Sequence, residues 1–173
     1  MNISKPIAGT YPDYYTNYIE LVKSEDLLTE LFNESILTIE LLSSLDEETL
    51  QFKYAEGKWN VKEVFQHVID CERIYCTRIL NIARDNSVPQ PGFDQDEFIK
   101  NSNASMRIIH DMIREFSLVR AASIELLKSL TSEMHERNGV ANNYEVSVKT
   151  LSYLIAGHEI HHRNVIEEKY IGN

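Results

Sequence analysis

The spacing of apolar residues most constrains this fold, because it follows the period of an α-helix along almost the whole chain. No internal repeat or low-complexity tract interrupts the pattern. A short helical turn is expected at 46–50. Four long helices are expected at 24–45, 60–86, 98–130 and 147–170. The sequence therefore predicts an all-α fold, a four-helix bundle.

Helix-capping residues stand at the starts of three of these segments. Ser24 is followed by two acidic residues, which suit a cap and a first turn. Asn60 can cap the second helix while Glu63 reaches back to its backbone N–H. Ser147 is expected to cap the fourth helix.

The longest interruption of the helical pattern lies at 87–97. Two prolines and a glycine within 88–92 cannot continue a helix. The gap is far longer than a tight turn needs, so it can cross the length of the bundle. The second and third helices then run parallel, which gives an up-down-down-up order. This topology places the start of the second helix beside the late part of the fourth.

Three histidines lie within five positions of the fourth expected helix, at 158, 161 and 162. His158 and His162 are about one turn apart and project from the same face. That face also carries the apolar residues Leu151, Leu154, Ile155, Val165 and Ile166. The pair can hold a metal ion, although hydrogen bonds to carbonyl or carboxylate groups would also satisfy it. His161 points about 80° away and is expected at the rim or in solvent.

A third metal ligand is expected from the second helix. His67 lies in its second turn, at the edge of the apolar stripe, where the topology brings the two helices together. His67, His158 and His162 offer three neutral nitrogens and leave a coordination position open for water or substrate. An open position is typical of a catalytic site. Nitrogen ligation suits Zn²⁺, Ni²⁺ or Fe²⁺.

The residues from His158 to His162 also match the zinc-protease motif H-E-x-x-H, in which the glutamate is a general base. A protease of this kind needs a further ligand downstream, but only eleven residues follow His162. Glu159 also turns about 80° away from the line of the histidine pair. We therefore interpret the match as accidental, and Glu159 stays a candidate base.

These features together resemble the DinB/YfiT-like superfamily. The resemblance rests on Trp59 eight residues before His67, on Pro91-Gly92-Phe93-Asp94-Gln95-Asp96, and on the His-x-x-x-His pair of the last helix. It spans about 24–170. The resemblance implies a four-helix bundle with this crossover, frequent dimers, and a metal ion bound by His67, His158 and His162.

Two kinds of activity follow from the resemblance. Some members are regarded as metal-dependent hydrolases, in which the metal activates water. Others resemble S-transferases or isomerases that use a low-molecular-weight thiol such as bacillithiol, mycothiol or glutathione. We expect a metal-dependent enzyme of one of these kinds that acts on a small-molecule substrate. The alternative is a non-catalytic bundle that binds metal or dimerises.

Four further residues near the expected site have two interpretations each. Asp70 can orient a ligand histidine or face solvent. Asp94 can receive a proton, although helix capping is the simpler interpretation. Cys71 is either a soft ligand or, as we expect, a buried structural cysteine. Trp59 is expected to be a packing anchor rather than a substrate platform.

Residues outside the expected site receive simpler interpretations. His110 and His135 have no partner pattern and are expected at the surface. Residues 1–23 form an N-terminal arm. Its aromatic residues are expected to dock the arm on the bundle or on a second copy of the chain: Tyr11, Tyr14, Tyr15 and Tyr18.

Composition limits the partners and the compartment. A formal net charge of −10 opposes nucleic acid and anionic membranes as partners. No apolar run approaches the roughly twenty residues of a membrane helix, and no secretory segment is visible. Cys71 and Cys76 point apart on one helix, as suits a reducing compartment. We expect one domain over 1–173, a cytoplasmic location and a homodimer.

Overall fold

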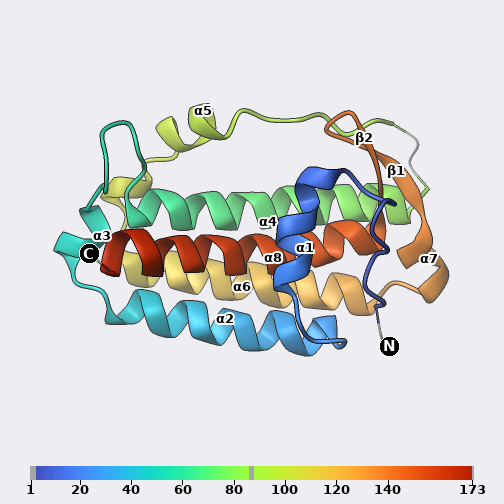
Figure 1. The fold of residues 1–173 in the computed structure, drawn as a ribbon, viewed down its shortest axis with the longest axis horizontal. Helices are drawn as coiled ribbons and strands as arrows, with labels where there is room; N and C mark the ends of the chain where they lie inside the picture. Colours follow the sequence, from blue (N-terminus) through green and yellow to red (C-terminus); the bar gives the residue numbers. More distant parts are fainter. Residues whose placement is uncertain (1–2, 86–87, 173) are drawn as a thin grey trace.

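The structure, a computed structural model, describes residues 3–85 and 88–172 and is a four-helix bundle, as predicted (Figure 1). Helices α2 and α8 run in one direction, and α4 and α6 run in the other (Figure 1). The up-down-down-up order is therefore confirmed. The four long helices are α2 (Leu27–Ser44), α4 (Val61–Ala83), α6 (Ile109–Lys128) and α8 (Val148–Ile166).

Capping explains where three of these helices begin. The Asn60 side chain accepts a hydrogen bond from the Glu63 N–H at 2.9 Å, and Glu63 accepts one from the Asn60 N–H at 2.8 Å. Ser147 caps α8, as predicted. The cap expected at Ser24 is wrong, because α2 is capped by Asp26, whose carboxylate accepts from the Thr29 N–H.

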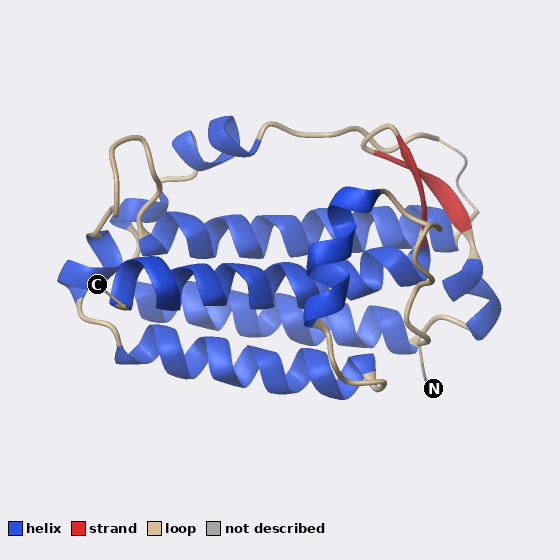
Figure 2. Cartoon of the chain, in the orientation of Figure 1, coloured by secondary structure: helices blue, strands red, loops and turns tan. Residues whose placement is uncertain are grey.

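The connection after α4 returns along the outside of the bundle to the end where α4 began (Figures 1 and 2). It contains α5 (Gln95–Lys100) and the short turn η2 (Ala104–Met106). The expected helix over 98–130 is wrong at its start, since the chain leaves the helical conformation before α6. Asn103 has a φ of 54°, in the left-handed region that ends helices. The end expected for the second helix, residue 86, lies outside the described residues.

A small hairpin follows α6 and the short helix α7 (Ser132–Glu136). Its strands, β1 (Asn138–Ala141) and β2 (Tyr144–Ser147), pair antiparallel. The two-residue turn is Asn142-Asn143, with φ values of 51° and 67°, which match the right-handed twist of a hairpin. The hairpin lies between the helices expected at 98–130 and 147–170, where no strand was predicted. The hairpin also contacts the crossover, because the Asn142 N–H donates to the Gln90 carbonyl at 2.9 Å.

The N-terminal arm docks on the bundle. Its helix α1 (Thr16–Leu21), preceded by η1 (Asp13–Tyr15), crosses α8 (Figure 1). Gly157 permits this approach, since a Cβ at that position would lie 2.1 Å from the Tyr18 carbonyl oxygen. The arm therefore lies directly beside His158.

The remaining elements complete the ends of the bundle. Helix α3 (Glu47–Gln51) forms where a short helical turn was expected, and a π-helical turn (Glu167–Ile171) follows α8. Both cysteines are free. Among the described helices, none is long and apolar enough to cross a membrane.

One expected surface residue is buried. His110 is exposed, but His135 is only 4% exposed because α7 packs against α8. Neither ring nitrogen of His135 makes a hydrogen bond of normal geometry within the described structure. Burial lowers the pKa of His135 below its usual value of 6.5, and the Leu127 carbonyl opposes this only in part.

Replacing His135 should therefore make the unfolding free energy depend less on pH below neutral pH. With a lowered pKa in the folded state, His135 binds more protons when unfolded, so it destabilises the fold as the pH falls below 6.5. We expect His135→Leu to lose less unfolding free energy than wild type between about pH 7 and about pH 5, measured by urea denaturation. Exposed His110→Leu is the control. An equal loss in wild type and His135→Leu would contradict the assignment.

Candidate metal centre

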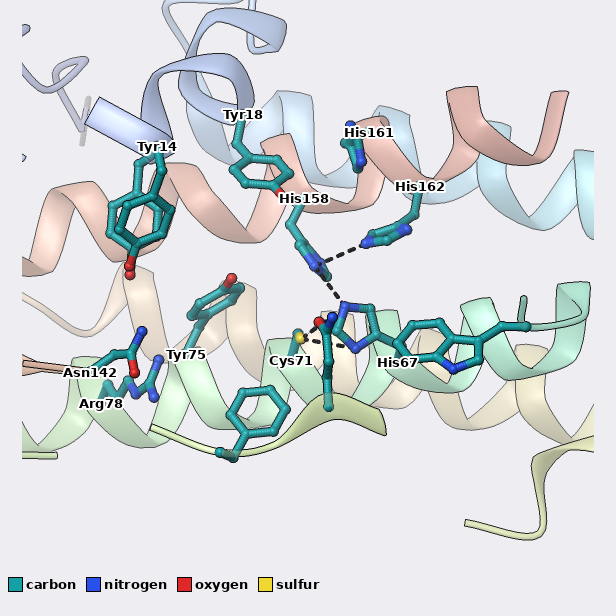
Figure 3. A pocket seen from close by; sticks show the side chains of 14 residues that line it. Tyr14, Tyr18, His67, Cys71, Tyr75, Arg78, Asn142, His158, His161 and His162 are labelled. Atoms are coloured by element: carbon teal, nitrogen blue, oxygen red, sulfur yellow. Dashed lines mark hydrogen bonds between the residues drawn. The ribbon is translucent and has the colours of Figure 1, made fainter. Parts of the chain in front are cut away.

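The structure brings His67, His158 and His162 together between α4 and α8 (Figure 3). The Nε2 atoms of His67 and His158 are 3.1 Å apart, and those of His158 and His162 are 3.2 Å apart. The antiparallel packing of α4 and α8 produces this meeting, because the second turn of α4 faces the later half of α8. The expected juxtaposition of the two helices is thus present.

Two of the three pairs of imidazoles, His67–His158 and His158–His162, have nearly the spacing of ligands around one ion. With metal–nitrogen bonds of about 2.0 to 2.1 Å, nitrogens around a tetrahedral ion lie about 3.4 Å apart. Both separations are close to that value. Imidazole nitrogens are donors that suit a divalent metal ion such as Zn²⁺.

Burial keeps the three imidazoles neutral, which is the form that binds metal. It lowers the pKa of His67 to about 4 and that of His162 to about 3. The pKa of His158 is well below its usual value because of burial and then because of His162 and His67 beside it. Each lone pair is therefore available near pH 7.

Cys71 lies at the edge of the same cluster. Its Sγ is 3.6 Å from both ring nitrogens of His67. One ligand atom each from His67, Cys71 and His158 lie within 4.8 Å of one another, and among the described residues this group does not include His162. Burial raises the pKa of the Cys71 thiol to about 12, so the free thiol stays protonated. The expected burial is present, but Cys71 also stands within reach of the candidate ion.

Glu159 points away from the histidines into the bundle core. It is 1% exposed and pairs with the Nη1 atom of Arg120 at 2.7 Å. Arg120 also binds Glu72 through two hydrogen bonds of 2.9 Å and donates to the Leu31 carbonyl at 2.7 Å. Burial raises the pKa of Glu159, and Arg120 opposes this shift. This position does not suit a base that acts at the histidine cluster.

The two aspartate candidates also lie away from the histidines. Asp70 is half-buried and accepts a hydrogen bond from Gln66 at 2.9 Å, rather than from His67. Asp94 is exposed and caps α5, accepting from the backbone N–H groups of Asp96 and Glu97. The capping interpretation therefore describes Asp94.

A cavity of about 430 Å³ opens beside the cluster, lined by residues of α4, α8, the arm, the crossover and the hairpin. Within the described structure no aspartate or glutamate lines it. Trp59 packs against the apolar core, as expected, and it also lines the cavity with its ring centroid 5.0 Å from that of His67. His161 stands at its rim against Tyr18, with ring centroids 5.1 Å apart.

Several residues that line the cavity were not predicted as site residues, among them Tyr75, Arg78, Gln95 and Asn142. A signal for two of them was present. Cys71, Tyr75 and Arg78 follow His67 by four, eight and eleven residues, which places all four on one face of α4. That face forms one wall of the cavity (Figure 3).

Comparison with known proteins agrees with this architecture. The model of the DinB superfamily matches residues 37–166. An Oceanobacillus iheyensis protein named "Putative metal-dependent hydrolase" is 27% identical over 124 residues, which are 71% of each chain. The solved structure of YfiT from Bacillus subtilis, described as "a probable metal-dependent hydrolase with an unusual four-helix bundle topology", is 17% identical with a TM-score of 0.77, covering 97% of this chain and 95% of YfiT.

A second solved structure has the same fold. It is a mycothiol-dependent maleylpyruvate isomerase, 14% identical, with a TM-score of 0.65. The match covers 86% of this chain but 62% of the isomerase, so the chain spans less than two thirds of that protein.

Replacing Arg120, whose side chain is buried and charged, should destabilise the protein strongly. Arg120→Met leaves Glu72 and Glu159 buried without their partner, which costs about 3 to 5 kcal/mol of unfolding free energy. Arg114→Met, which removes an exposed ion pair with Asp111, should change it by less than about 1 kcal/mol. Urea denaturation of both variants measures the difference. Equal effects of the two substitutions would show that the ion pairs of Arg120 with Glu72 and Glu159 do not stabilise the bundle.

Proposed function

This chain belongs to the DinB superfamily, and we propose that it is a metal-dependent enzyme acting on a small molecule. The proposed ligands are His67, His158 and His162. The observation that carries the proposal is the convergence of their Nε2 atoms, with separations of 3.1 and 3.2 Å, beside a cavity. Zn²⁺, Ni²⁺ and Fe²⁺ all suit three imidazole ligands.

A divalent ion at this site supplies a Lewis acid that activates water or a thiol. The chain's own residues hold and enclose the reactants. The imidazoles stay neutral through burial, and the Trp59 ring lies beside His67 with ring centroids 5.0 Å apart. The Cys71 thiol, with a pKa of about 12, does not serve as the nucleophile.

Two reaction classes fit this site, and each has its own support. Hydrolysis is supported by the name of the Oceanobacillus relative. Thiol-dependent transfer or isomerisation is supported by the mycothiol dependence of the structural neighbour. The described cavity lining contains no carboxylate base, and neither class requires one, because a divalent ion would lower the pKa of a water or of a thiol alike.

Metal content tests the ligand assignment. We expect about one metal ion per chain in protein purified without chelators, and a loss of affinity of more than about tenfold in His67→Ala, His158→Ala and His162→Ala, because even the outer partners of ligands are worth that much. Elemental analysis and calorimetric titration measure both. His161→Ala, at the rim of the same cluster, should retain the metal. Full metal content in the three ligand variants would refute the assigned site. If the wild-type protein bound no metal, the result would favour the alternative of a non-catalytic bundle.

Cobalt substitution tests whether Cys71 is a fourth ligand. Thiolate bound to Co²⁺ gives a charge-transfer band in the near ultraviolet, whereas imidazole ligands alone do not. With three histidine ligands and an open position, the wild-type and Cys71→Ser spectra should be the same. A band that is lost in Cys71→Ser would instead assign a closed site with four protein ligands.

Turnover separates the two reaction classes. The metal-loaded protein is incubated with a low-molecular-weight thiol and an electrophile, and separately with activated esters and amides. Product that requires the thiol, the metal and His158 assigns thiol transfer. Turnover of the esters and amides alone removes the transferase interpretation and assigns hydrolysis.

A further inference from the structure

Arg78 is a buried cation without an anionic partner. It is 4% exposed, on the face of α4 that carries His67, and it lines the cavity. Its guanidinium donates to the Pro91 carbonyl at 2.7 Å, and no carboxylate lies within ion-pair distance of it in the described structure. Buried charges are normally paired, as Arg120 is with two glutamates. Arg78 therefore retains donors for an anion that enters the cavity.

The hairpin turn brings the Asn142 amide to the same cavity as this guanidinium (Figure 3). Arg78 binds Pro91, while the next residue, Gly92, packs against Asn142 so closely that a Cβ would lie 2.2 Å from its Oδ1 atom. Asn142 is fixed by its φ of 51° and by its backbone bond to Gln90. Its side chain lines the cavity and makes no hydrogen bond to another described residue.

Two tyrosines that are influenced by the charge of Arg78 also line the cavity. Burial raises the pKa values of Tyr15 and Tyr75, so both phenols keep their protons. Both side chains line the cavity, and the positive charge of Arg78 acts on each of them. The Arg78 end of the cavity therefore presents a guanidinium and an amide, whereas the Tyr75 ring lies 5.9 Å from that of His158. No carboxylate in the described lining competes with a bound anion.

The cavity thus has two ends of different chemistry. Arg78 follows His67 by eleven residues, which separates their Cα atoms by about 16 Å along the helix axis. We propose that Arg78 and Asn142 bind a carboxylate group of the substrate or thiol cosubstrate, while the other end of that molecule reaches the histidine cluster. The inference rests on the proposed function for the placement of the reactive end. A planar carboxylate matches the fork of a guanidinium.

Binding of matched thiols tests the proposal. The zinc-loaded protein is titrated by calorimetry with ω-mercaptoalkanoates of increasing chain length, each compared with the ω-mercaptoalcohol of the same length. At the length that spans the cavity, we expect the carboxylate to bind more than about tenfold tighter, as suits a charge-assisted hydrogen-bonded pair. At lengths too short to reach Arg78, the two should bind alike.

The hairpin turn offers a matched pair of variants. Asn142→Asp places a negative charge beside Arg78 without removing its bond to Pro91, and it should abolish the carboxylate preference. Asn143→Asp makes the same change of charge at the neighbouring turn position, where φ is also positive and the side chain is exposed outside the described lining. It should keep the preference. If both variants lost the carboxylate preference equally, the cause would be the change in net charge, and the proposal would be overturned.

Two further binding experiments distinguish a failure of the proposed function from a failure of this inference. Failure of zinc to bind refutes the proposed function, and alkanoates compared with alkanols on the metal-free protein then test the Arg78 end alone. Zinc and thiol binding without a carboxylate preference refutes the inference and leaves the proposed function standing. A preference for ω-mercaptophosphonates over carboxylates of more than about tenfold would assign a phosphoryl group and overturn the carboxylate assignment.

Discussion

The buried side chain of Arg120 is the constraint on which the rest of the bundle depends. From α6 it contacts Glu72 on α4, Glu159 on α8 and the Leu31 carbonyl on α2. Apolar contacts have no strong directional preference, but a buried cation has a high energetic cost unless each partner lies within hydrogen-bonding distance. Along α4 and α6 this polar layer lies between two apolar clusters. It therefore fixes how the four helices are placed relative to one another.

The same contact sets the direction of the metal-ligand candidates. Glu159 directly follows His158, and successive residues on a helix point about 100° apart. With Glu159 held against Arg120, His158 faces α4 and His162 follows it one turn later. The resemblance to a zinc-protease motif thus has a structural explanation. The glutamate sets the rotation of α8, and the histidines meet His67 as a consequence.

Local patterns predicted most of the fold and the histidine cluster, but they failed where tertiary contacts decide. The caps at Asn60 and Ser147 and the break at 88–92 are local signals, and the crossover followed from the length of that break. The hairpin at Asn142 was missed because its short strands lack a clear alternating pattern. Arg78 was missed because an arginine on a helix is usually exposed, and its burial depends on a crossover that returns over α4.

The break that sets the topology also builds the far end of the cavity. Prolines prevent a continuous helix there, and the carbonyl of Pro91 accepts a hydrogen bond from Arg78. Gly92 leaves room for the Asn142 amide, which a side chain would displace. The histidine end depends instead on the packing of α4 against α8, deep in the bundle. Substitutions in the crossover or the hairpin turn can therefore change which molecule binds at the Arg78 end while the packing that brings the three histidines together stays the same.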